Sequence, residues 1–139
     1  MNRAGYFSGD LEYTGSLIGP SDERLKQNIQ PITGALAKVM QLKPHTFTFK
    51  TDGDYGKMNL AAGPQFGLIA QELEQTLPEL VVESSHPLDP PEDKSSKPRT
   101  LAYKGVKYID LIPVLIQAIK EQQEKIEQLE SKIQQLMNR

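Results

Sequence analysis

The sequence lacks cysteine and tryptophan and is poor in aromatic residues of every kind. Without cysteine the chain forms no disulfide, has no thiol nucleophile and offers no Cys-ligated zinc site. Aromatic residues make up 6% of the 139 residues and hydrophobic residues 37%, so the chain can bury only a modest core. We therefore expect association between chains to supply part of its stability.

An excess of one charge and long apolar runs are absent as well. The formal net charge is −2, and the lysines and arginines are dispersed along the chain, which argues against a nucleic-acid surface. No apolar stretch approaches the roughly 20 residues that a membrane-spanning helix needs. We expect neither nucleic acid nor a membrane as a partner.

Motifs for metals and cofactors are also missing. The stretch Asp52–Gly56, D-G-D-Y-G, resembles the start of a calcium loop, but Gly63 stands where such a loop needs Glu. His45 and His86 have no Cys or His at ligand spacing, and no common glycine-rich nucleotide loop is present. The sequence predicts no metal site and no cofactor.

Residues 1–20 form a lead punctuated by glycines, with alternating stretches such as D-L-E-Y-T. This pattern is typical of short strands and turns. The lead is too short to bury its own apolar side chains, so we interpret it as the end of a β-structured stalk that lies upstream.

Residues 21–108 mix helical and strand patterns, which predicts a small α+β domain. We expect helices over 22–28, 33–41 and 70–77, and strands over 45–50, 66–69, 80–83 and 99–104. The polar, proline-rich stretch 84–98 interrupts the last two strands and predicts a projecting hairpin arm. Such an arm either covers a neighbouring chain or stays disordered, and the sequence leaves both open.

Residues 109–139 carry the strongest periodic signal, with Asp110 as the expected N-cap. Apolar residues alternate at steps of three and four, as in a coiled coil, with one polar member. These stripe positions are Ile112, Leu115, Ile119, Gln122, Ile126, Leu129, Ile133 and Leu136. A helix of about 28 residues is roughly 42 Å long and extends past so small a domain. Spacing alone leaves dimer and trimer open, and the alternative is a helix folded back on its own domain.

The start of the domain, S-D-E-R-L-K-Q-N-I over 21–29, has two interpretations. In the first, Ser21 caps the following helix, with acidic residues favourably placed in the first turn. In the second, Ser21 is a nucleophile and Lys26 its base. Side chains five residues apart on a continuous helix point roughly 140° apart, so the two can meet only if Ser21 lies outside the helix. Both interpretations require that geometry.

Three blocks in this order carry a family resemblance: 21–29, then F-G-L-I-A-Q-E-L-E-Q-T-L-P-E-L-V over 66–81, then Y-K-G-V-K-Y-I-D-L-I-P-V-L-I-Q-A-I-K-E over 103–121. With the coiled coil that follows, the sequence resembles the C-terminal intramolecular chaperone domains of phage tailspikes, tail fibres, neck appendages and endosialidases. This self-cleaving family is grouped as peptidase S74.

The resemblance implies a homotrimer with a parallel coiled coil, which assists folding of the upstream stalk and then cuts itself off. Carried over by position, the cut falls between Pro20 and Ser21, with Ser21 as nucleophile and Lys26 as base. Asp22, Arg24 and Asn28 are possible supporting residues. The resemblance also implies a virion protein assembled in the bacterial host cytoplasm. The alternative is a trimerising fibre tip or assembly cap that does not cleave.

Overall fold

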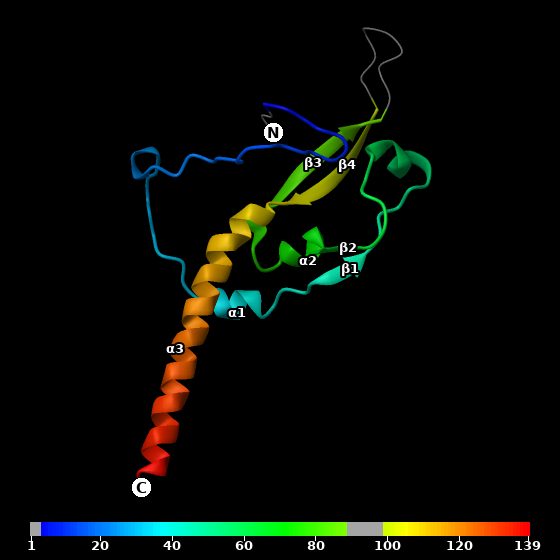
Figure 1. The fold of residues 1–139 in the computed structure, drawn as a ribbon. Coiled ribbons are helices and arrows are strands. Elements are labelled where there is room, and N and C mark those ends of the chain that lie inside the picture. The colour runs from blue at the N-terminus through cyan, green and yellow to red at the C-terminus, as the bar shows by residue number, and fades with distance from the viewer. Residues whose placement is uncertain (1–3, 89–98) are drawn as a thin grey trace.

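The computed structural model describes residues 4–88 and 99–139 and has the mixed helix-and-strand architecture predicted from the sequence (Figure 1). Two small antiparallel sheets and several short helices lie beside the first part of one long helix, whose other end projects from the body. The α-helices are α1 Ala35–Val39, α2 Ala70–Leu73 and α3 Leu111–Met137. The strands are β1 His45–Phe47, β2 Gln65–Gly67, β3 Val81–Pro87 and β4 Thr100–Val106. Four short 3-10 helices are η1 Glu23–Leu25, η2 Gly53–Met58, η3 Pro78–Leu80 and η4 Tyr108–Asp110.

The core is small and lies where α1 and α2 meet the beginning of α3. Leu73 is its largest fully buried side chain, at 2% exposure. The other members of the buried cluster are Ala35, Leu77, Leu80, Leu111, Val114 and Ala118. Because few large side chains are buried, the core contributes only modestly to the free energy of unfolding.

The predicted hairpin forms, and β3 is longer than expected. Its pairing with β4 runs from Val81 opposite Val106 to Pro87 opposite Thr100, whereas the sequence predicted a strand that ends at residue 83. Lys104 contacts the carboxylates of Glu74 and Glu83, which ties the hairpin to the segment after α2. The rest of the predicted arm, residues 89–98, lies outside the described residues.

Two neighbouring faces of α3 have different environments. Leu111, Val114 and Ala118 pack into the domain core. The predicted coiled-coil stripe lies on the adjacent face, and its apolar members are between 41% and 65% exposed in the single chain. The beginning of the helix therefore packs on its own domain, as the alternative proposed, while the stripe itself remains uncovered. Within the described ranges no helix combines the length and the apolar character that crossing a membrane requires.

Several short elements differ from the prediction. The expected helix over 22–28 is only the 3-10 helix η1, because Asn28 adopts a left-handed φ of 54° and the chain leaves helical conformation at Lys26. Gly34, at φ 65°, turns the chain immediately before α1, which starts at Ala35 rather than Thr33. The predicted loop over 51–64 contains η2. Residues 4–20 form no strand within the described part of the single chain, so their interpretation as the end of a β-structured stalk stays a prediction.

Candidate functional site

The structure brings Ser21 and Lys26 together. The Lys26 Nζ donates a hydrogen bond to the Ser21 Oγ at 2.9 Å. Ser21 lies outside η1, and Lys26 follows it in an extended conformation, so the short turn between them folds the lysine back towards the serine. The two side chains therefore meet by the geometry that the sequence requires.

Asp22, and not Ser21, is the N-cap of η1. Its carboxylate accepts a hydrogen bond from the Arg24 amide at 2.9 Å and forms an ion pair with the Arg24 guanidinium at 2.7 Å. The Arg24 side chain, followed by the Arg24 amide, lowers the pKa of Asp22 below its usual range. The interpretation of Ser21 as the cap is therefore wrong, because the aspartate beside it takes that position and leaves the Ser21 hydroxyl to Lys26.

The supporting residues named from the sequence lie in different surroundings relative to Ser21. Arg24 is close to the pair in the chain, but its guanidinium is bonded to Asp22. Asn28 makes no hydrogen bond to Ser21 or Lys26 within the described chain, and its backbone forms the turn that follows. Neither side chain is positioned at the serine in this arrangement.

The backbone amides of η1 are largely occupied. The amide of Arg24 donates to the Asp22 carboxylate, and those of Leu25 and Lys26 donate to the carbonyls of Asp22 and Glu23. These three amides are therefore unavailable to an oxyanion without a rearrangement.

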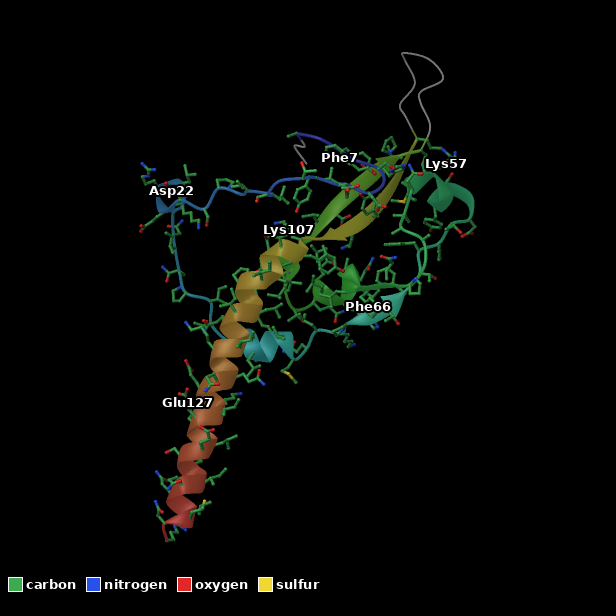
Figure 2. The ribbon with its side chains drawn as sticks, in the orientation of Figure 1. Phe7, Asp22, Lys57, Phe66, Lys107 and Glu127 are labelled. Atoms are coloured by element: carbon green, nitrogen blue, oxygen red, sulfur yellow. The ribbon has the colours of Figure 1, made fainter. Side chains whose placement is uncertain are left out.

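The Ser21–Lys26 pair is exposed in the single chain, on a segment that stands away from the hairpin and from α3 (Figure 2). Leu25 and Ile29 on the same segment are 72% and 58% exposed. Exposed apolar side chains of this kind are common singly, so these two do not by themselves identify a binding surface.

The other polar clusters have structural partners of their own. The His45 Nε2 lies 2.8 Å from one Glu72 carboxylate oxygen, and the Lys43 Nζ lies 3.9 Å from the other. No group of three or more potential metal ligands gathers in the ranges 4–88 and 99–139.

Comparison with known proteins identifies the segment that carries the pair. Residues 21–82 match the Peptidase S74 family, described as chaperone of endosialidase, and the match begins at Ser21. The resemblance seen in the sequence is thereby confirmed.

The chain is also similar to the long tail fibre proteins Gp37 of Enterobacteria phages K3 and T2. Each is 32% identical to it over 131 residues, which cover 91% of this chain. The same alignments cover 9% of each fibre protein, so the chain corresponds to a small part of these relatives.

Sequence reasoning missed the contacts that join segments of the chain far apart in sequence. Glu121 of α3 accepts hydrogen bonds from the amides of Ala35 and Leu36, and the Tyr6 hydroxyl is bonded to the ring of His86. In the sequence, Gly34 indicates a helix start at α1, and because glycine has no side chain to cap the first amides, the cap must come from elsewhere. Nothing in the spacing indicates that the cap comes from α3.

Proposed function

We propose that this chain is an intramolecular chaperone that trimerises, assists folding of an upstream phage-fibre segment, and then releases itself by cutting between Pro20 and Ser21. The observation that carries the proposal is the 2.9 Å contact between Ser21 and Lys26 at the first residue of the family match. Residues 1–20 are then the end of the client, 21–108 the chaperone and protease body, and 109–139 the trimerising helix. The product is a virion component assembled in the host cytoplasm.

The uncovered stripe of α3 supports association through this helix. Heptad spacing runs from Ile112 to Leu136, and none of its apolar members is buried by the chain itself. The face used for the domain core is a different one, so three helices can pair along the stripe without detaching from their own bodies. A parallel three-stranded coil also places three leads at the same end, as a trimeric stalk requires.

The cut proceeds through an ester. The Ser21 Oγ attacks the carbonyl carbon of Pro20, and neutral Lys26 takes the hydroxyl proton. The Pro20–Ser21 amide bond breaks as its nitrogen receives that proton, which leaves Pro20 esterified to the Ser21 oxygen. Water then hydrolyses the ester to a Pro20 carboxylate and a free Ser21 hydroxyl.

Assembly provides a reason for the timing. The Lys26 amine donates a hydrogen bond to the serine in the single chain, but only a neutral amine can accept the proton of the serine hydroxyl. Burial disfavours the charged form of an amine, so covering this segment with a neighbouring copy favours the reactive state. Cutting then reports correct assembly, and the released stalk is retained by its unfolding barrier.

Two variants test the proposal. Ser21→Ala and Lys26→Ala chains should remain full length and still sediment as trimers, whereas the unaltered chain should lose its first twenty residues. Cleavage that persists in both variants would eliminate the serine-lysine mechanism. Sedimentation of the unaltered chain as a monomer would eliminate the trimer.

The exposure of the pair and the occupied amides of η1 support a second candidate, a trimerising fibre tip that does not cut. In that case the unaltered chain sediments as a trimer but keeps its full mass. The same two measurements therefore separate the candidates.

A further inference from the structure

We propose that the β3–β4 hairpin at His86, together with η2, forms a binding site for the lead. This site keeps the lead attached after the Pro20–Ser21 bond is cut. We call this site the leader clamp, and its residues are His86, Lys57, Met58 and Asn59. Its ligand is an extended peptide segment with a tyrosine and a serine two residues apart, supplied by Tyr6 and Ser8. The biological consequence rests on the proposed function, but the binding itself does not.

The centre of the clamp is His86, a buried polar residue at 5% exposure. Its Nε2 lies 3.0 Å from the Lys57 carbonyl oxygen, which can only accept, so this nitrogen carries the hydrogen. In the neutral ring Nδ1 is then an acceptor, and the Tyr6 hydroxyl lies 2.5 Å from it, within hydrogen-bond distance. Removing the lead would leave this buried nitrogen without its tyrosine partner, which disfavours release.

A second contact holds the lead two residues further on. The Ser8 hydroxyl donates to the Met58 carbonyl at 3.1 Å and accepts from the Asn59 amide group at 3.4 Å. Asn59 reaches this position from a left-handed conformation at the end of η2, with φ 50°. The lead is therefore fixed by side chains on both elements of the clamp.

The two elements of the clamp are joined independently of the lead. Arg99, next to β4, forms an ion pair with Asp54 of η2 at 2.7 Å, and His86 bonds η2 through the Lys57 carbonyl. Figure 2 shows Phe7 on the lead where it passes the hairpin, and Lys57 on the neighbouring helix η2. A hollow of about 650 Å³ lies between lead and body, bounded by the lead, η2 and β4. The clamp therefore keeps its shape when the lead leaves.

The clamp and the cut site are well separated along the chain. Residues 9–20 between them are exposed, so cutting after Pro20 leaves the contacts of Tyr6 and Ser8 unchanged. In a trimer three clamps hold three strands of one stalk, and all three must open before the stalk separates. Cutting and release are then two distinct steps.

The test uses the full chain with Ser21→Ala, so that it does not depend on self-cleavage. A site for a sequence-specific protease is inserted after Gly15, the lead is cut there, and a fluorophore on its amino terminus reports how long it stays bound at micromolar concentration. The lead should remain bound, and Tyr6→Phe, which removes only the hydroxyl, should shorten its residence about fivefold. Ser8→Ala should act in the same direction.

Tyr13→Phe is the matched control, since Tyr13 lies on the same lead, is 58% exposed and makes no hydrogen bond within the described residues. It should leave the residence time unchanged. Loss of the cut lead from the parent chain at once, or equal residence in the Tyr6→Phe and Tyr13→Phe chains, would overturn the clamp. Neither result depends on whether the unaltered chain cleaves itself.

Discussion

The Glu121 carboxylate of α3 accepts a hydrogen bond from the Leu36 amide at 2.8 Å and one from the Ala35 amide at 3.1 Å. A side chain of the long helix thus caps the first turn of α1, where the amides have no partner within their own helix. These bonds, the one from Leu36 above all, lower the pKa of Glu121. Because α1 follows the segment that carries Ser21 and Lys26, this cap fixes the end of that segment to the helix proposed to trimerise.

Glu121→Gln should reduce the stability of the chain and make it less sensitive to acid. The pKa of Glu121 is lowered in the folded state, so its contribution is present above the unfolded-state pKa and is lost as the pH falls through the lower folded-state pKa. The urea unfolding midpoints of the Glu121→Gln and unaltered chains should therefore differ more at about pH 7 than at about pH 4. Glu124→Gln, an exposed change three residues further along α3, is the control and should alter neither midpoint. A difference in unfolding midpoint between the Glu121→Gln and unaltered chains that is larger at the lower pH would contradict the role of Glu121 as a charged cap.

Leu73→Ala should lower the free energy of unfolding by about 2–5 kcal/mol, because it empties the most completely buried position of a small core. Leu17→Ala makes the same change on the lead, where Leu17 is 69% exposed, and should cost under about 0.5 kcal/mol. Denaturant unfolding of the two variants gives the comparison. Equal losses would mean that the core lies elsewhere.

Lys26→Arg should abolish cleavage while leaving the fold and the oligomer intact. Arginine can still donate a hydrogen bond towards Ser21, but it stays protonated and cannot act as the base. The intact mass after prolonged incubation measures this, with Lys132→Arg on α3 as the control that should still be cut. Cleavage by the Lys26→Arg chain at an undiminished rate would show that another group takes the proton.

Ile126→Asp should prevent trimer formation and, with it, the cut. It places a charge in the middle of the exposed stripe, which would become buried in a coiled coil. Gln128→Asp introduces the same charge on another face of α3 and should still sediment as a trimer and be cut. A monomeric Ile126→Asp chain that cleaves as fast as the unaltered one would separate cutting from assembly.

The sequence predicted those features that depend on local pattern. Heptad spacing located α3 and its stripe, and the proline-rich break between two strand patterns located the hairpin. The five-residue separation of Ser21 and Lys26 correctly required the serine to lie outside the helix, and the structure places their side chains 2.9 Å apart.

Features that depend on contacts between distant segments were beyond the sequence. Helix propensity over 22–28 gave no warning that Asn28 would turn left-handed and Asp22 would take the cap. The clamp joins residues 80 positions apart through a histidine that spacing alone marked only as an unlikely zinc ligand. Such pairings arise from tertiary packing, which local patterns do not encode.

The most direct test of the self-cleavage is the intact mass of the chain after expression and assembly. We predict a fragment that begins at Ser21 and runs to Arg139, found only in the trimeric fraction and absent from the Ser21→Ala chain. A trimeric fraction in which every chain still carries Pro20 joined to Ser21 would contradict the self-cleavage on which the account depends.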